Sequence, residues 1–560
     1  MIHRIKKFKI LLLLALVLFF ALFVRLYDLQ KVPVGFHYDE AQIGYNAYSL
    51  LKTGHDKNNV FLPLAIDEFG DFRPAGYHYL AIPFIATLGL NEFATRLPGA
   101  LFGAFSIIPM FFLSKKLFKS KAVGLISSAL LAIVPWHVVT SRATSESIIA
   151  MFFVLSGSSL LVYYLDNKKI KFLLISYFLF ALSFFFYHSA RFFVPAFLIS
   201  TNFFIFLTKD LQSKFVKKSL VVSNLILILF LVLLLYVSKG AARPANISIF
   251  STPETNLKLS EQIREDGGQS TFITRFFHNK VINYAYTFSS NYSDHMTARF
   301  LFLEGGLPPR YTVVQNGLIY PSLALFVILG LSFLLIELIQ KKSFRSIFIL
   351  LWLILGPVPA ALSYEDLPNI QRSIMMLPAL VLIIAFGIMK MSESISSEKF
   401  KMLIAGVFVI LLSYNAMFFF HNYFQHSFTH RSWYRSVGEG KLIKKVDELS
   451  KGKRITIMTR SNENYLIFFL FYQKIDPAYY ISSGSPRGKT RFKNLVFVDD
   501  ECPLSDSLKY VDNKEAIYVN SGNCRTPEYA RELASIVRTD GTKAFTLLEV
   551  KDNMRASIKK

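Results

Sequence analysis

The sequence contains almost no cysteine. Among its 560 residues only Cys502 and Cys524 are present, and both lie near the C-terminus. An oxidising compartment would allow them to pair, but the sequence does not show how far apart they lie. Internal repeats, heptads, low-complexity tracts and Walker or Gly-x-Gly-x-x-Gly signatures are also absent. Nucleotide-driven transport therefore has no visible support.

Long apolar runs are what the sequence has instead. Hydrophobic residues make up 53% of the chain, and 56 of them are Phe. Apolar runs of spanning length predict an α-helical polytopic membrane protein. The first run lacks a small-x-small cleavage site before Asp28, so we expect it to be retained as a span. The expected spans, about eleven, are 10–29, 93–114, 122–139, 144–165, 172–188, 192–208, 219–238, 317–339, 346–363, 373–390 and 402–421.

The positive charge of the chain follows the same pattern. The net charge is +24, but the lysines sit in short clusters between the apolar runs, which is the positive-inside pattern and not a nucleic-acid-binding surface. Basic residues before the first run place the N-terminus in the cytoplasm. The clusters expected inside are Lys115, Lys116, Lys119 and Lys121; Lys168, Lys169 and Lys171; Lys209, Lys214, Lys217 and Lys218; Lys341, Lys342 and Arg345; and Lys390, Lys399 and Lys401.

Whether the apolar segment 74–89 crosses the membrane decides on which side every later loop lies. If it crossed the membrane, every later lysine cluster would fall outside, so we expect an in-plane amphipathic helix. Residues 30–92 then form a long first outer loop with helical pieces near 39–52 and 74–89. A second outer loop covers 239–316, and an odd number of spans places the C-terminus outside.

The composition changes after Tyr423, which predicts two domains. Residues 1–425 form the transmembrane domain, and residues 426–560 read as a small extracytoplasmic α/β domain. Its expected strands are 454–458, 495–498, 516–519 and 544–550, and its expected helices are 464–472 and 526–535.

An acidic pair, Asp39-Glu40, follows directly on the first span in an aromatic setting with His37. Adjacent carboxylates so close to a membrane are costly unless water, a partner or a ligand's chemistry needs them. The alternative is a solvated loop that happens to be acidic.

Arginine, histidine and acids recur at the expected outer ends of the spans, where lysine is scarce. Arg73, Arg142, Arg191 and Arg372 outline a possible site for an anionic headgroup, because the guanidinium fork matches phosphate oxygens. Ordinary snorkelling of interfacial arginine is the alternative, but it does not explain the accompanying Glu146 and His188.

Carboxylates that face a phosphate-binding cavity can serve in transfer of a sugar from a glycosyl phosphate. A glycosyl phosphate leaves readily once arginine neutralises its charge, and the acceptor then needs a general base. Asp39 is the natural base, with Glu40 or Glu146 as its orienting or metal-binding partner.

Three segments resemble the GT-C membrane glycosyltransferases, in particular the family-39-like group of protein O-mannosyltransferases and lipid A aminoarabinose transferases. They are the acidic pair, 69–80 (FGDFRPAGYHYL) and 90–103 (LNEFATRLPGALFG), with weaker similarity at 187–195 and 356–378. The resemblance covers roughly residues 10–420. It implies a multi-pass protein of the plasma membrane, a polyprenyl-phosphate-linked sugar donor and inverting transfer to an extracytoplasmic acceptor.

The resemblance also suggests roles for single residues. Where the aminoarabinose transferases have Glu-Lys-Pro-Pro, this chain has Phe72-Arg73-Pro74-Ala75, so Arg73 can take the phosphate contact of the lysine, whereas Phe72 cannot replace the glutamate. Metal binding and a lipid A substrate are therefore in question. Asp39 and Glu146 are the candidate ligands if a divalent metal ion is used. The expected substrate-binding residues are His37, Asp71, Tyr77, His78, Arg142, Glu146 and His188.

Two other functions remain open at this point. One is a transporter or flippase for a lipid-linked sugar, although such carriers usually show internal repeats and breaks in mid-span. The other is a membrane-anchored binding protein whose chemistry lies in residues 426–560. The sequence identifies neither the sugar nor the acceptor, which can be protein, lipid or polysaccharide.

Overall fold

The computed structural model describes residues 2–68, 71–207, 214–238, 242–268, 271–430, 432–451, 454–459, 464–485, 491–511 and 515–551. Phe69, Gly70 and Lys209, which the sequence analysis used, lie outside these residues. The chain divides into two compact units. The helical unit comprises Met1–Tyr27, Leu64–Tyr77 and Gly99–Phe420, and the α/β unit comprises Asp28–Pro63, His78–Pro98 and His421–Lys560.

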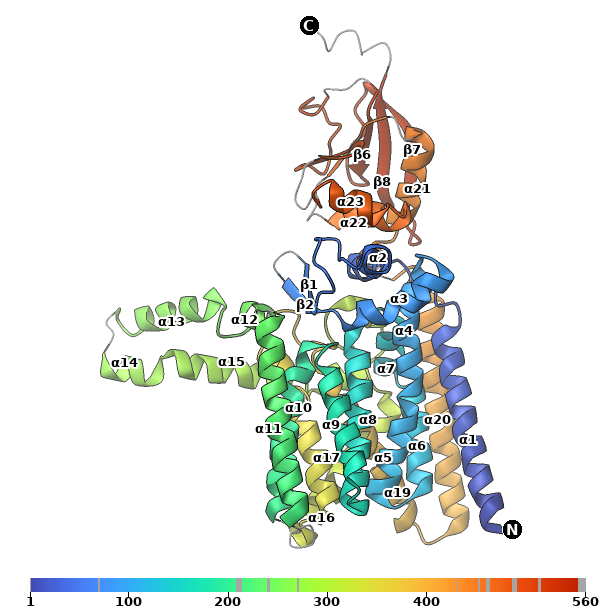
Figure 1. Ribbon diagram of the computed structural model, residues 1–560, viewed down its shortest axis with the longest axis vertical. Helices are drawn as coiled ribbons and strands as arrows, with labels where there is room; N and C mark the ends of the chain where they lie inside the picture. Colours follow the sequence, from blue (N-terminus) through green and yellow to red (C-terminus); the bar gives the residue numbers. More distant parts are fainter. Residues whose placement is uncertain are drawn as a thin grey trace. The chain divides into compact units, whose positions relative to one another are not determined.

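The helical unit is a bundle of long apolar helices (Figure 1). Its helices are α1 (Ile2–Leu26), α4 (Glu92–Phe105), α5 (Ile107–Phe118), α6 (Lys121–Ile133), α7 (Pro135–Arg142), α8 (Glu146–Asn167), α9 (Ile170–Ser183), α10 (His188–Leu207), α11 (Lys214–Val237), α12 (Ala242–Ile247), α13 (Pro253–Glu265), α14 (Phe272–Phe277), α15 (Lys280–Asp294), α16 (Ala324–Lys341), α17 (Phe344–Leu355), α18 (Val358–Ala361), α19 (Leu377–Ser394) and α20 (Glu398–Phe424), of which α4 begins and α20 ends in the other unit. Strands β1 (Ala65–Glu68) and β2 (Asp71–Pro74) form an antiparallel hairpin beside the bundle.

The prediction of a polytopic membrane protein is confirmed. Within the described residues, nine helices are long and apolar enough to cross a membrane, and the bent pair α6–α7 would make a tenth. Helix α9 is shorter, with 14 residues. These segments occupy the eleven regions expected from the sequence, whereas α3 (Gly76–Leu88) is not among the candidate spans.

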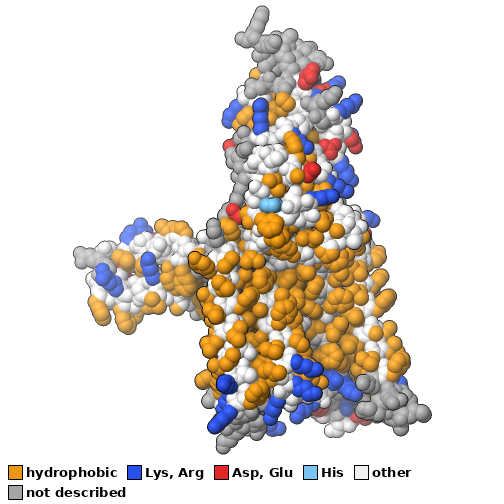
Figure 2. Space-filling model, in the orientation of Figure 1, with side chains coloured by type: hydrophobic (Ala, Val, Ile, Leu, Met, Phe, Trp, Pro, Cys, Tyr) orange, Lys and Arg blue, Asp and Glu red, His pale blue; other side chains and the backbone are white. Residues whose placement is uncertain are grey.

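The surface of the bundle has the composition that a bilayer requires. Helices α1, α11 and α20 expose most of their apolar side chains, whereas α8 and α19 are largely buried in the centre. Figure 2 shows the resulting belt of hydrophobic side chains, with lysine and arginine gathered at one end of the bundle. In water such a surface would be strongly unfavourable, so we assign this belt to lipid.

The α/β unit contains one mixed sheet of six strands in the order β4-β5-β3-β6-β8-β7. Strand β3 pairs in parallel with β5 and β6, and the remaining pairs are antiparallel. The strands are β3 (Thr456–Thr459), β4 (Arg491–Phe492), β5 (Leu495–Val498), β6 (Ile517–Ser521), β7 (Ala530–Val537) and β8 (Lys543–Val550), and the helices are α21 (Glu439–Ser450), α22 (Asn464–Tyr472) and α23 (Pro477–Ser482).

The expected helix at 526–535 is wrong. Residues Ala530–Val537 form strand β7, which pairs with β8 across a turn that contains Asp540-Gly541. The Arg, Glu, Ala and Leu residues of this stretch favour a helix locally, but pairing with a buried neighbouring strand outweighs so weak a preference. Cys502 and Cys524 form a disulfide, with their Cα atoms 5.7 Å apart.

The α/β unit also recruits residues from the expected first outer loop. Helix α2 (Tyr38–Thr53) and part of α3 pack with the C-terminal residues instead of with the bundle. Phe36, Tyr45 and Ile85 share one hydrophobic core with Phe468 and Phe471. The two units therefore divide the chain differently from the single boundary expected at 425/426. The sequence shows only where composition changes, and two short segments of the first outer loop leave no such change.

Candidate functional site

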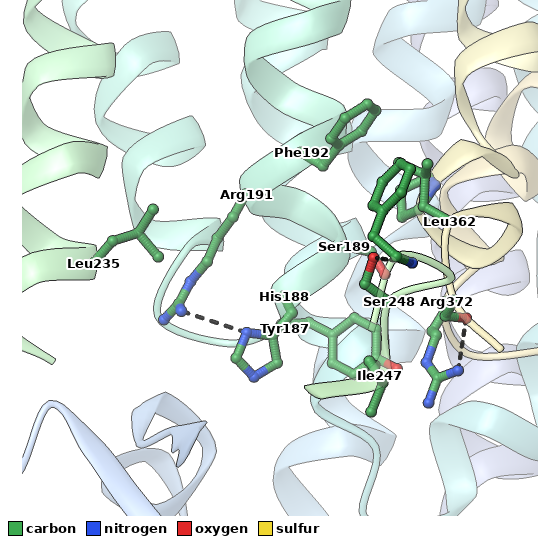
Figure 3. Close-up of a pocket in the computed structure, with 13 residues that line it drawn as sticks. Tyr187, His188, Ser189, Arg191, Phe192, Leu235, Ile247, Ser248, Leu362 and Arg372 are labelled. Carbon is green, nitrogen blue, oxygen red and sulfur yellow. Dashed lines mark hydrogen bonds between the residues drawn. The ribbon is translucent and has the colours of Figure 1, made fainter. Parts of the chain in front are cut away.

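A pocket of about 330 Å³ lies in the helical unit at the start of α10 (Figure 3). Its walls are mostly apolar, and its polar groups are few, as is usual for a small-molecule site. It is lined by Tyr187, His188, Ser189, Arg191, Phe192, Leu235, Ile247, Ser248, Phe250, Pro359, Leu362, Ser363 and Arg372.

Arg191 and His188 come from the first turn of α10. The Nε of Arg191 donates to the carbonyl oxygen of Phe184 (2.9 Å), and its Nη1 lies 3.4 Å from Nδ1 of His188. The turn between α9 and α10 is thereby tied to the helix that follows it. Arg191 is buried, so its charge is held in a site with little water.

Arg372 reaches the pocket from a different segment, on the other side of Tyr187 (Figure 3). Its Nη1 donates to the hydroxyl of Ser363 (2.8 Å) and to the carbonyl oxygen of Glu365 (2.7 Å). Its backbone N–H donates to Oδ1 of Asn369 (2.8 Å). These bonds fix the direction of the guanidinium and leave its carboxylate contact, to Glu365, long at 3.4 Å.

Arg73 is placed near the pocket by strand β2. The backbone N–H of Gly76 donates to the carbonyl oxygen of Phe185 (2.9 Å), and a Cβ on Gly76 would lie only 2.4 Å from that oxygen. Glycine therefore allows the hairpin to dock on the turn before α10. The Nε of Arg73 lies 3.3 Å from the Asp71 carboxylate, so Asp71 orients it.

Two of the three expected donor-binding arginines, Arg191 and Arg372, line the same pocket. Arg73 is not part of the lining, and its role in donor binding stays a prediction. Tyr187 lies between the two arginines of this pocket (Figure 3), and Arg372 acts electrostatically on its phenol. Glu146, in the first turn of α8, also acts on Tyr187.

Two other expected site residues, Arg142 and Tyr77, make contacts with backbone groups of the helical unit. Arg142 is fully buried and donates to the carbonyl oxygens of Val24 and Tyr27 (2.8 Å to the latter), where α1 ends. Such carbonyls lack partners within their own helix, so a cation satisfies them well. The Tyr77 hydroxyl accepts from the backbone N–H of Gly99 (3.1 Å).

The acidic pair lies in the α/β unit, in the first turn of α2. His37 is the N-cap: its Nδ1 accepts from the backbone N–H of Asp39 (3.2 Å), and its own N–H donates to Glu40 (3.1 Å). This is a reciprocal capping box. Nδ1 of His37 also lies 3.4 Å from the Asp39 carboxylate.

The Glu40 carboxylate is held by two arginines. Nε of Arg96 lies 2.9 Å from Oε1 and Nη2 of Arg435 lies 2.8 Å from Oε2, with all three side chains buried. Burial alone would raise the pKa of Glu40, but the charges of Arg96 and then Arg435 outweigh it and hold the pKa far below its usual value. Glu40 is thus held as an anion between two buried arginines.

His78 is fully buried in the α/β unit. Among the described residues, no group of three or more His, Cys, Asp or Glu side chains is arranged to hold a metal ion. A role of Asp39 and Glu146 as metal ligands therefore stays a prediction.

Sequence reasoning did not assign Arg96 or Arg435. Arg96 lies within the segment 90–103, which the sequence analysis used only for its resemblance to a family. Arg435 is 395 positions from Glu40, and nothing local to it predicts the contact.

Comparison with known proteins agrees with this architecture. A family model described as dolichyl-phosphate-mannose-protein mannosyltransferase matches residues 73–236. The solved structure of ArnT from Cupriavidus metallidurans superimposes with a TM-score of 0.53 at 11% identity, over 97% of this chain and 98% of that one. The chain has the fold of the GT-C membrane glycosyltransferases.

Other structures with the GT-C fold match as well. ArnT bound to undecaprenyl phosphate gives a TM-score of 0.52 at 10% identity, over 96% of this chain and 98% of that one. The oligosaccharyltransferase AglB from Archaeoglobus fulgidus, in complex with an inhibitory peptide and a dolichol-phosphate, gives 0.50 at 12% identity and 83% of this chain. This chain spans only 64% of the length of AglB. No curated protein matches the sequence.

Proposed function

We propose that this protein is an integral-membrane glycosyltransferase that moves a sugar from a polyprenyl-phosphate donor to an extracytoplasmic acceptor with inversion. The observation that carries the proposal is a pocket with apolar walls that contains Arg191 and Arg372, with the hairpin of Arg73 joined to the turn before α10 through Gly76. A lipid phosphate needs both an apolar surface for its chain and forked cations for its charge. The GT-C fold and the match of residues 73–236 support the same reaction class.

The proposed reaction is a single displacement. The acceptor oxygen or nitrogen forms a bond to the anomeric carbon while the bond from that carbon to the phosphate oxygen breaks. The arginines stabilise the departing polyprenyl phosphate, and Asp39 takes the proton of the acceptor. Glu40, already paired with two arginines, holds the turn that carries Asp39.

Donor turnover by the purified protein tests this function directly. We expect the protein in detergent or nanodiscs to release polyprenyl phosphate from at least one member of a panel of polyprenyl-phosphate monosaccharides. A transporter would move the intact lipid between leaflets of vesicles without breaking the bond. Translocation without any release of polyprenyl phosphate would therefore refute an enzyme and favour the flippase.

Arg73→Ala should weaken use of the donor by about tenfold to a hundredfold, because a charge-assisted contact in a partly dry site is worth roughly 1.5–3 kcal/mol. Donor use by Arg73→Lys should lie between those of wild type and Arg73→Ala, since lysine keeps the positive charge but lacks the guanidinium fork. Steady-state kinetics at varied donor concentration measures the effect. Arg299→Ala, which removes a highly exposed arginine paired with Glu304, serves as the control. Equal kinetics for Arg73→Ala and wild type would exclude Arg73 from the donor site.

Labelling tests the proposed orientation in the plasma membrane, with the N-terminus inside and the α/β unit outside. Single cysteines at Val60, Arg264 and Asp506 should react with an impermeant maleimide in intact cells, and cysteines at Lys169 and Lys399 should not. All five positions are exposed, and the native cysteines are paired as a disulfide. Strong labelling at Lys169 or Lys399 would mean that the segment 74–89 spans the membrane.

A further inference from the structure

Helices α13, α14 and α15 form an arm, residues 253–294, that projects sideways from the bundle of the helical unit (Figure 1). The chain enters the arm after α11 and α12 and rejoins the bundle before α16. Residues 269–270, between α13 and α14, lie outside the described residues.

The side chains buried within the arm are polar. Thr255, Thr274 and Asn283 are its buried residues, and Asn283 is 8% exposed. The Nδ2 of Asn283 donates to Oε1 of Gln262 (2.9 Å), which ties α15 to α13. The Thr271 hydroxyl accepts from the backbone N–H of Thr274 (3.2 Å) and caps α14.

The large apolar side chains of the arm point outward instead. Phe272 is 83% exposed, Val281 75% and Tyr286 73%. The other exposed apolar residues of the arm are Leu257, Ile273, Phe276, Phe277 and Ile282. Figure 2 shows hydrophobic side chains along the arm, accompanied by a few lysines and arginines.

This arrangement is the reverse of a helical hairpin in water. A hairpin in water buries its apolar side chains between the helices and leaves polar ones outside. Helices surrounded by lipid associate through small and polar residues and present their apolar side chains outward. The arm follows α11 in the chain, after the short helix α12, and α11 exposes Leu229, Leu233 and Tyr236 on the lipid-facing belt. The surroundings of the arm can therefore be the same bilayer.

We propose that the arm lies in the plane of the membrane, with its aromatic and aliphatic side chains in the headgroup–acyl boundary of the bilayer that holds the bundle. Interfacial helices combine such an apolar surface with charged residues that stay in the headgroups. Here the charged residues are Glu254, Lys258, Glu261, Arg264, Glu265, Asp266, Arg275, Lys280 and Asp294.

The bilayer would then support one wall of the pocket. The ring of Tyr284 in the arm packs against Phe250 with 4.9 Å between centroids, and Phe250 lines the pocket. On the other side, Asn291 Nδ2 donates to the carbonyl oxygens of Ala361 and Ser363 (both 3.1 Å). The arm is therefore joined to the pocket at its base, and its other helices would lie against the membrane.

Fluorescence of the full-length protein in lipid nanodiscs tests the proposal. A single cysteine replaces Phe276 or Val281 on the apolar surface, or Arg264 as a matched exposed control on the same arm, and carries an environment-sensitive NBD label. All three positions are exposed, so folding should survive the change. We expect labels at Phe276 and Val281 to emit at shorter wavelength than the control. Acyl-chain-brominated phospholipids should quench them at least twofold more, and iodide at least twofold less.

Equal iodide quenching at all three positions would place the arm in water and overturn the proposal. Protection from iodide without quenching by brominated lipid would mean that protein, such as a second copy of the chain, covers the arm, and this too would overturn it. The readout requires no turnover, so it stands whether or not the proposed transferase activity is found.

Discussion

Asp39→Asn should lower the turnover of a polyprenyl-phosphate sugar by about 10²- to 10⁴-fold, the usual value of a positioned general base. The amide keeps the size and polarity of the side chain but cannot accept the acceptor's proton. Binding of the donor should be nearly unchanged, because the contacts proposed for its phosphate are made by Arg73, Arg191 and Arg372 and not by Asp39. Single-turnover release of polyprenyl phosphate at saturating donor separates the chemical step from binding.

A structural role of Asp39 predicts a different result. The N-cap of α2 is His37, so Asp39 is not the cap, and an acid in the first turn of a helix contributes only about 0.3–1 kcal/mol through the helix dipole. Loss of this helix-dipole contribution would lower the stability slightly and leave turnover unchanged. Asp28→Asn is the matched control, since Asp28 is partly exposed and pairs only loosely with Lys31, at 3.7 Å. Wild-type turnover in Asp39→Asn would remove the base from the mechanism.

The transmembrane architecture was predictable because one physical requirement dominates it. Each span must be apolar over its whole length, and cytoplasmic loops carry an excess of lysine. Hydropathy and charge alone therefore locate the eleven regions. Helix α2 was predictable for a local reason, since its start carries acids followed by helix-forming residues. Strand β7 was not, because its state is decided by β8 and not by its own residues.

The candidate site was predictable in its chemistry but not in its geometry. Arginine at the ends of spans indicates anion binding, and two of the four chosen arginines, Arg191 and Arg372, line one pocket. Arg142 looked equivalent in the sequence, yet it binds the carbonyls at the end of α1. An arginine that donates to the carbonyls at a helix end and an arginine that binds a phosphate can have the same neighbours in the sequence. Only the tertiary contacts distinguish them.

Glu40→Gln should destabilise the α/β unit by about 3–5 kcal/mol, because it leaves the buried charges of Arg96 and Arg435 without their anion. Thermal unfolding of the purified protein measures this as a lower apparent Tm. Glu448→Gln is the matched control: it makes the same change in the same unit, but Glu448 is exposed and its pair with Lys445 is worth at most about 1 kcal/mol. An unchanged Tm in Glu40→Gln would contradict the structural role of the ion pairs.

The difference in stability between wild type and Glu40→Gln should depend on pH in a definite direction. The pKa of Glu40 in the folded protein lies below its ordinary value of 4.5, so its contribution to stability is complete above that pH and is lost as the pH falls toward the folded pKa. The gap between wild type and Glu40→Gln should therefore narrow below pH 4.5. Adding Arg435→Met to Glu40→Gln should recover part of the stability, because it removes one of the two uncompensated cations. We expect Asp39→Asn to lower turnover without changing the apparent Tm, and Glu40→Gln to lower the apparent Tm. These two results together would show that the adjacent acids have separate roles, one chemical and one structural.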